Sequence, residues 1–172
     1  MENIEHYKAI HAEAPEYGAG SRHFNFVLAI LVYLRSRTVI DYGCGKGVLA
    51  EQLTKIPHLY CEKYDPAIPE YDIKPDQKFD SLINTDVLEH IPESELDDTL
   101  RHFPDLSDQA IVIPHLRKAA QILPNGENAQ YTLKSPEQWS DILGGYYSNV
   151  VLLPHESDRH ALLFCSQKDV DL

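Results

Sequence analysis

The stretch that decides the fold is Thr38-Val39-Ile40-Asp41-Tyr42-Gly43-Cys44-Gly45-Lys46-Gly47-Val48-Leu49. A short β-branched run ends at an acidic residue, three glycines then alternate with other residues, and an apolar helical pattern follows. This order predicts a strand, a tight loop and a helix. Glycine allows a positive φ and leaves no Cβ between the chain and a ligand. The stretch therefore predicts a nucleotide-binding turn.

The residues after the second glycine argue against a phosphate ligand. A P-loop needs Ser or Thr after Gly-Lys, and Gly47 follows Lys46 here. A dinucleotide fingerprint needs a third small residue three places after Gly45, where Val48 stands. Both phosphate-binding interpretations are weakened.

The acidic residue two places before Gly-x-Gly-x-Gly instead resembles motif I of the class I S-adenosylmethionine (SAM) dependent methyltransferases, and residues 41–47 fit that motif without a gap. The resemblance implies SAM as cofactor, a nucleoside that carries an ammonium and a carboxylate but no phosphate. Asp41 would attract the ammonium, and the loop would line the methionine portion and the ribose. The loop residues implied as cofactor-binding are Tyr42, Gly43, Cys44, Gly45 and Gly47.

The same resemblance implies an α/β fold with a three-layer, Rossmann-like sheet. The expected strand order is 3-2-1-4-5-7-6 with an antiparallel last strand. At 172 residues the chain predicts a single methyltransferase domain. We expect residues 1–36 to form N-terminal helices, with Tyr7, His11 and Tyr17 as a lid or simply as a solvated face, and residues 37–172 to form the catalytic core.

The second strand is predicted over residues 58–64 and ends at Asp65-Pro66. A carboxylate about 20 residues beyond the glycine loop can accept hydrogen bonds from both ribose hydroxyls. In the resemblance this is the ribose-binding acid, so Asp65 and Pro66 are assigned to the cofactor. Glu62 is the competing acid, but it precedes the end of the strand.

Residues 66–79 depart from the family pattern because they contain three prolines, Pro66, Pro69 and Pro75. The third strand and its helix are expected to be reduced to a loop with a stub at 71–73. Asp72 and Ile73 are the candidates for contacting adenine.

A second match to the family lies at residues 78–92, where an alternating apolar strand runs into Asp86-Val87-Leu88-Glu89-His90. This pattern resembles the motif after the fourth strand of SAM-dependent methyltransferases. Asn84, Thr85 and Asp86 would lie at the carboxyl end of the central strand, where ligands bind in open α/β sheets. Asp80, at the start of the strand, is expected to be structural.

The remaining pattern predicts further elements by caps, periodicity and turn residues. They are a helix over 21–36 that is covered on both sides, helices over 48–56 and 94–102 with Ser94 as a cap, a strand over 109–113, a long loop over 114–136 that forms part of the substrate wall, a helix that starts with Ser135-Pro136, and a final hairpin of 149–153 with 160–165.

His90 and His115 follow the two strands that would bracket the methyl group, so either is a candidate general base. Each histidine also has a non-catalytic interpretation: His90 as a residue that packs or caps a short helix, and His115 as a solvated loop residue. Arg117 and Lys118 are candidate anion ligands or a solvated basic pair. No metal is expected, because His58 with Cys61 and His155 with His160 are the only local pairs, and neither has a ligand spacing typical of a metal site.

The formal net charge of −12, with scattered basic residues, disfavours nucleic acid and anionic membranes as partners. Three widely spaced cysteines predict reduced thiols and, with no signal-peptide pattern at the N-terminus, a cytoplasmic protein. A homodimer is left open.

The sequence therefore predicts a SAM-dependent methyltransferase that acts on a small-molecule oxygen or nitrogen, such as a metabolite, a sugar or a natural-product intermediate. The alternative is a non-catalytic SAM-binding or partner-binding domain. A NAD enzyme and a protein or nucleic-acid methyltransferase are disfavoured.

Overall fold

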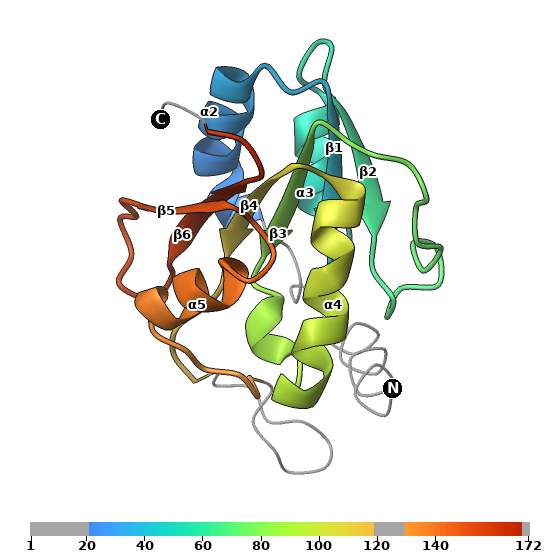
Figure 1. Cartoon of the computed structure of the whole chain (residues 1–172). Helices are drawn as coiled ribbons and strands as arrows, with labels where there is room; N and C mark the ends of the chain where they lie inside the picture. The colour runs from blue at the N-terminus through green and yellow to red at the C-terminus, as the bar shows by residue number, and fades with distance from the viewer. Residues whose placement is uncertain (1–20, 119–129, 170–172) are drawn as a thin grey trace.

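A six-stranded sheet forms the centre of the molecule in the computed structural model, which describes residues 21–118 and 130–169 (Figure 1). Its strand order is β2-β1-β3-β4-β6-β5. β2, β1, β3 and β4 pair in parallel, and β6 is antiparallel to both of its neighbours. The strands are β1 (Thr38–Tyr42), β2 (Tyr60–Tyr64), β3 (Ser81–Thr85), β4 (Gln109–Ile113), β5 (Asn149–Leu153) and β6 (Leu162–Ser166).

Helices cover both faces of this sheet. The helical elements are η1 (Ser21–His23), α2 (Phe24–Leu34), α3 (Val48–Thr54), η2 (Leu88–His90), α4 (Glu93–Leu106) and α5 (Pro136–Leu143). Buried residues of α2 and α3 belong to one apolar cluster, and buried residues of α4 and α5 belong to the other. The predicted three-layer, Rossmann-like fold is therefore confirmed.

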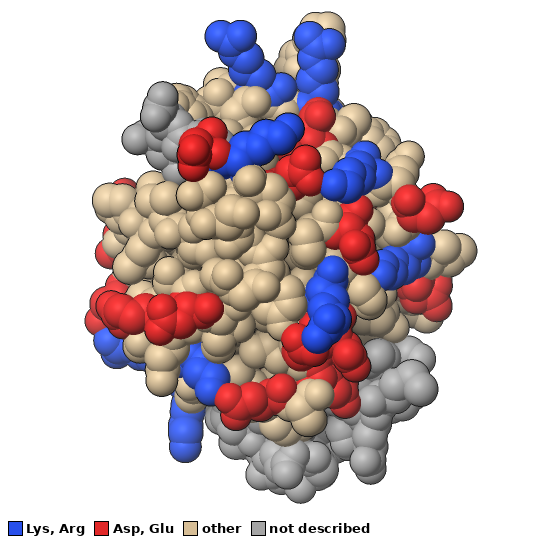
Figure 2. Space-filling view, in the orientation of Figure 1, with Lys and Arg blue, Asp and Glu red and all other residues tan. Residues whose placement is uncertain are grey.

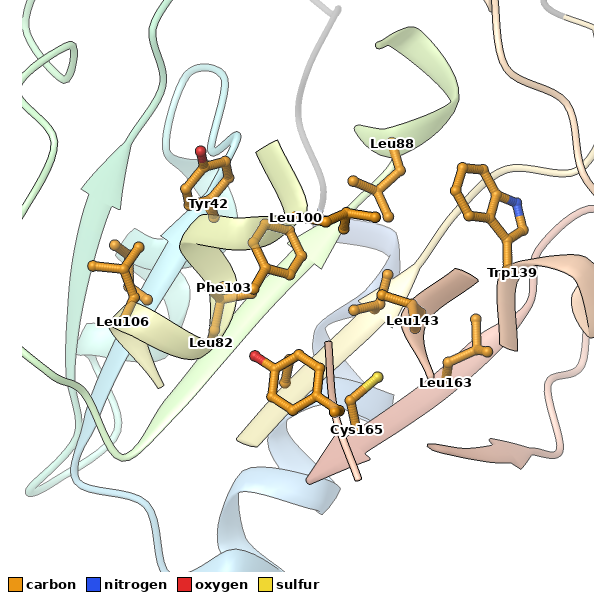
Figure 3. Packing of buried hydrophobic residues seen from close by; sticks show 14 of the residues in the cluster. Tyr42, Leu82, Leu88, Leu100, Phe103, Leu106, Trp139, Leu143, Leu163 and Cys165 are labelled. Atoms are coloured by element: carbon orange, nitrogen blue, oxygen red, sulfur yellow. The ribbon is translucent and has the colours of Figure 1, made fainter. Parts of the chain in front are cut away.

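Successive side chains along a strand point to opposite faces of the sheet, so each strand contributes to both apolar clusters. In β3, Leu82 belongs to the cluster under α4 and α5, whereas Ile83 belongs to the cluster under α2 and α3. Figure 3 shows side chains from α4, α5 and the sheet meeting in the first of these clusters. Phe103 and Trp139 are fully buried there. Full burial of each large apolar side chain contributes roughly 1.5–3 kcal/mol.

The third strand of the expected order is absent, because residues 66–79 contain no strand. The predicted reduction of residues 66–79 to a loop is confirmed, but the predicted stub at 71–73 is not formed: Tyr71 and Ile73 lie in bends, and Ile73 is 85% exposed. Three prolines remove backbone donors from this segment, so it cannot continue a hydrogen-bonded ladder. Among the described residues, β2 therefore lies at one edge of the sheet.

Both predicted ends of α4 need correction. Pro92, not Ser94, is the N-cap of α4, and the helix continues to Leu106 with Pro104 inside it. Its buried face runs through Phe103 and Leu106, so packing extends the helix past the proline. The predicted start of α5 at Ser135-Pro136 is confirmed, and it includes a capping box: Ser135 Oγ accepts from the Gln138 amide, and the Gln138 side chain accepts from the Ser135 amide.

Helix α2 is not covered on both sides by the described residues, since Val32 and Tyr33 are more than half exposed. The proposed lid residues Tyr7, His11 and Tyr17 lie outside the described part of the chain. Within the described ranges no helix has the length and apolarity needed to cross a bilayer.

Candidate cofactor and active site

The glycine loop between β1 and α3 requires its glycines. Gly43, Gly45 and Gly47 have φ values of 82°, 52° and 74°, in the left-handed region that other residues rarely adopt. A Cβ on Gly43 would lie 2.5 Å from a methyl carbon of Val87, so the loop packs directly on the segment after β3. The two sequence motifs are therefore in contact.

The backbone of this loop is tied to the end of β2. The amides of Gly43 and Cys44 both donate to the carbonyl of Tyr64, at 2.7 and 3.1 Å. The amide of Gly45 donates to Oδ2 of Asp65 at 2.8 Å. These three amides, which the sequence argument assigned to the cofactor, thus hold the loop in shape. A ligand would meet the bare backbone surface that the glycines leave.

Asp65 connects the loop with the segment after β2. Its Oδ1 accepts from the amide of Ala67 at 2.8 Å, in addition to the bond from Gly45, and the residue is buried. Because a carboxylate has about four acceptor positions, two remain for ribose hydroxyls. Glu62 instead accepts from the hydroxyl of exposed Tyr60, which favours Asp65 as the ribose acid. Pro66, next to it, is exposed.

Asp41 lies beneath the loop and is only 2% exposed. Burial raises its pKa to about 7 and the nearby Asp65 charge adds to the rise, while the amide of Ala50 and the Lys63 ammonium oppose it. The amide of Ala50 belongs to the first turn of α3, so Asp41 joins the end of β1 to that helix. The geometry gives Asp41 a structural task that the sequence argument did not include.

Four other residues that were predicted to bind the cofactor differ in their exposure. The ring of Tyr42 packs in the core against Tyr64 and Phe103, with centroids 4.8 and 5.0 Å apart, so only its backbone reaches the loop. Cys44 is buried as a free thiol. Asp72 and Ile73 lie together on the surface after β2. Their exposure is compatible with an adenine contact.

The residues at the end of β3 are held by β1 and by histidines. Asn84 is fully buried and donates to the carbonyl of Tyr42 at 2.7 Å, and Thr85 is buried beside it. Asp86 has a φ of 55°, uncommon for a residue other than glycine. Such strain is frequent at functional sites.

The carboxylate of Asp86 meets a cluster of histidines that the sequence argument missed. Nε2 of His23 lies 3.1 Å from its Oδ2, and Nε2 of His160 lies 3.1 Å from its Oδ1. Although burial opposes this effect, the two rings lower the pKa of Asp86 well below its usual value. His155 and His115 extend the cluster, with ring centroids 5.5 and 4.8 Å from that of His160.

This cluster has no local sequence signature, because its members come from segments far apart in the chain. Topology supplies the explanation: β6 is antiparallel to β4, so residues just before β6 lie at the carboxyl end of β4. His115 and His160 form an isolated antiparallel bridge there. His23 reaches the same edge from η1.

The two candidate bases have different surroundings. Nδ1 of His115 lies 2.7 Å from the carbonyl of Arg117 and 3.2 Å from its amide, so the tautomer of the ring decides whether Nδ1 donates or accepts. Burial lowers the pKa of His115. Nε2 of His90 lies 3.8 Å from the Glu89 carboxylate. Arg117, a candidate anion ligand, pairs with Asp158.

Glu89 adds a fully buried carboxyl next to Asp86. Its burial, and then the Asp86 charge, raise its pKa well above the ordinary value. The backbone carbonyl of Glu89 accepts from the amide of Thr132, whose hydroxyl donates to Ile91. The end of the long 114–136 loop therefore lies on η2, beside the end of β3.

Comparisons with known proteins agree with this arrangement. A family model described as a methyltransferase domain matches residues 10–133, which is more than half of the chain. No curated protein matches.

Solved structures with a similar fold include three methyltransferases. The methyltransferase domain of bacterial CtHen1-CN has a TM-score of 0.62 and 17% identity, over 85% of this chain and 98% of that one. Magnesium protoporphyrin IX methyltransferase from Synechocystis PCC 6803, with bound SAH, has a TM-score of 0.59 and 18% identity, over 86% and 83%. The 1,6-didemethyltoxoflavin-N1-methyltransferase of Burkholderia thailandensis, with its substrate and S-adenosylhomocysteine, has a TM-score of 0.63 and 12% identity, over 95% and 86%.

The glycine loop, the acid after β2 and the motif after β3 meet at one edge of a sheet with this topology, and the family model covers all three. The chain therefore belongs to the methyltransferase domain family and has the fold of the class I SAM-dependent methyltransferases.

Proposed function

We propose that this protein binds SAM at the glycine loop and transfers its methyl group to an oxygen or nitrogen of a small molecule. The observation that carries the proposal is the contact between the two motifs: Gly43 packs on Val87, while Gly45 is bonded to Asp65. In this proposal the glycine loop, Asp65 and the end of β3 line three sides of one nucleoside site.

Each wall has a part of SAM to meet. The free acceptor positions of Asp65 suit the two ribose hydroxyls, and exposed Asp72 and Ile73 suit the adenine amino group and ring face. The negative charge of Asp41, once ionised, favours the ammonium of the methionine portion. Two of the structurally similar methyltransferases were crystallised with the demethylated product of SAM, which supports the same cofactor here.

The acceptor is proposed to be a small molecule because the charge of the chain disfavours a polyanion. The net charge is −12, and Figure 2 shows acidic and basic side chains interspersed on the face it presents. Nucleic-acid binding by charge alone needs a continuous basic area. Two of the proteins with similar structures are methyltransferases of a porphyrin and of a toxoflavin precursor, both small molecules.

The enzyme's main task would be to hold the acceptor in line with the activated methyl group. An acceptor hydroxyl or ammonium also has to lose a proton, for which His90 and His115 remain the candidates. The test compares His90→Gln with His115→Gln. The variant that lacks the base should have a kcat lower by about 10²–10⁴-fold, with unchanged SAM affinity. If kcat falls only slightly and equally in both variants, neither histidine is the general base.

Isothermal titration calorimetry with SAM, its demethylated product and NAD tests the cofactor. SAM and the product should bind and raise the melting temperature, because a ligand of the folded state stabilises it. NAD should do neither. Failure of both SAM and its product to bind contradicts the proposal, whereas binding without turnover on a broad acceptor panel favours a non-catalytic SAM-binding domain.

Asp65→Ala tests the ribose assignment, with Asp80→Ala as the matched control. Asp80 also accepts hydrogen bonds from two backbone amides, those of Arg37 and Thr38, but it lies at the amino-terminal end of the parallel strands, away from the glycine loop. Each variant loses two hydrogen bonds to a charged acceptor, so each should lose stability, by roughly 1.5–3 kcal/mol per bond. Only Asp65→Ala should also weaken SAM binding. Equal SAM affinity in the two folded variants would refute the assignment.

A further inference from the structure

Three ligating side chains from distant segments meet at the end of β3. They are His23 of η1, Asp86 after β3 and His160 before β6. One ligating atom from each lies within 4.8 Å of the others, in a search confined to the described residues. Two of the separations, each between an imidazole nitrogen and an Asp86 oxygen, are 3.1 Å.

Within the described chain, the hydrogen bond between Nε2 of His23 and Oδ2 of Asp86, at 3.1 Å, accounts for only one side of this cluster. The side chain of His160 is 6% exposed, and neither of its nitrogens has a hydrogen-bond partner among the described residues. Oδ1 of Asp86 has none either, although His160 Nε2 lies close to it, because the two atoms are not aligned for a hydrogen bond. A buried polar atom without a partner is energetically unfavourable, and a bound ion is one of the explanations for such atoms.

The backbone holds the Asp86 carboxylate in this place. Its φ of 55° is rare for aspartate, and its amide donates to the carbonyl of Ile113 at the end of β4, at 2.9 Å. His23 is likewise buried, with a side chain only 2% exposed. Three side chains fixed by three separate elements lose little freedom when they bind a common partner.

Two imidazole nitrogens and one carboxylate oxygen form a donor set that suits divalent transition metals such as Zn²⁺ and Fe²⁺. With metal–ligand bonds of about 2.0–2.2 Å, neighbouring ligand atoms lie roughly 3.0–3.5 Å apart. The two 3.1 Å separations, one to each carboxylate oxygen of Asp86, fall in this range. Mg²⁺ is a poor match, because it prefers oxygen ligands.

We propose that His23, Asp86 and His160 bind one divalent transition-metal ion. Three protein ligands leave at least one coordination position for water or for a further ligand. Asp86 is followed by Val87, which packs on Gly43, so the cluster lies near the glycine loop. The proposal does not depend on SAM binding, and it replaces the expectation of no metal, which considered only local pairs of residues.

The test uses the full-length protein, treated with chelator and dialysed. Titration with Co²⁺ should give the visible absorption of a bound ion, and calorimetry with Zn²⁺ should give one site per chain. Mg²⁺ should not compete at equal concentration. Zn²⁺ should also raise the melting temperature, since it binds the folded state.

His160→Asn removes Nε2 from the cluster, because asparagine is too short to place an atom there. His58→Asn is the matched control: His58 is exposed, in the loop before β2, and its positive φ of 68° is one that asparagine tolerates. Affinity for Co²⁺ and Zn²⁺ should fall at least tenfold in His160→Asn and stay unchanged in His58→Asn.

Asp86→Asn provides a second variant with nearly the same shape if His160→Asn does not fold, as judged by circular dichroism. Absence of Co²⁺ and Zn²⁺ binding by the wild type would overturn the proposal and leave the three residues as an ion-pair cluster. Binding that survives in folded Asp86→Asn or His160→Asn would overturn it as well, since the ion would then be held by other histidines.

Discussion

Replacing Asp41 by Asn should stabilise the protein progressively, relative to the wild type, as the pH rises from 5 to 8. The Asp41 carboxyl is 2% exposed and its pKa is about 7, against 3.8 in a free chain. The folded chain therefore holds a proton that the unfolded chain has already released. The free energy of unfolding must fall as the pH rises between these two values.

The size of the effect follows from the two pKa values. The full displacement of about three units corresponds to about 4 kcal/mol. Between pH 5 and pH 8 the wild type should lose about 2.5 kcal/mol through this carboxyl alone. Asparagine has no charge to bury and can still accept from the amide of Ala50, so the variant escapes this loss.

Urea denaturation of both proteins at pH 5, 6, 7 and 8, without SAM, measures the difference directly. All other groups titrate in both proteins and cancel. Glu137→Gln is the control: Glu137 is exposed, and hydrogen bonding by Ser135 lowers its pKa, so it is ionised throughout this range. The stability of that variant relative to the wild type should not change with pH. A constant difference between Asp41→Asn and the wild type would refute the reasoning.

The same carboxyl links stability to the proposed cofactor. If the ammonium of SAM approaches Asp41, binding favours the ionised form and should release a proton near pH 6.5. Calorimetry in two buffers of different ionisation enthalpy measures this release. The same proton uptake or release in Asp41→Asn and the wild type would assign Asp41 to the loop structure alone.

Other substitutions test the loop, the core and the adenine contact. Gly43→Ala should lower the melting temperature and SAM affinity, because its Cβ would lie 2.5 Å from a Val87 methyl carbon, whereas Gly144→Ala, at the end of α5, should leave SAM affinity unchanged; equal affinities would contradict the packing. Trp139→Ala should cost roughly 3–5 kcal/mol in urea denaturation followed by circular dichroism, since Trp139 is fully buried. A cost below 1 kcal/mol would contradict its place in the core. Ile73→Ala should leave stability unchanged, because Ile73 is 85% exposed, but should weaken SAM binding severalfold; unchanged calorimetric affinity would exclude the adenine contact.

The sequence predicted the parts of the fold in which local signals agree with the tertiary structure. The glycine spacing between β1 and α3, and the Ser135-Pro136 pair before α5, are strong local signals, so the strand, the loop and the start of α5 lie where expected. It failed where packing overrides local preference. Helix α4 continues past Pro104 because Leu106 completes its buried face.

The candidate site divides in the same way. Asp65 follows a strand at a fixed distance from the loop, so a sequence argument could find it, and its bond to Gly45 supports the choice. His23 was not found, and His160 was considered only as a local pair with His155, because nothing in the local sequence connects either residue with Asp86. Their meeting with Asp86 depends on the antiparallel pairing of β6 with β4, which becomes visible only in three dimensions.

The absence of the third strand has a consequence for self-association. It leaves β2 with one unpaired side among the described residues, and such an edge is a template for strands of other chains. The segment 66–79 folds back there, since the amide of Asp65 donates to the carbonyl of Tyr71. Its three prolines lack amide donors, and Glu62 places a charge on the edge strand itself. The proline-rich segment thus protects the unpaired side of β2 from pairing with strands of other chains.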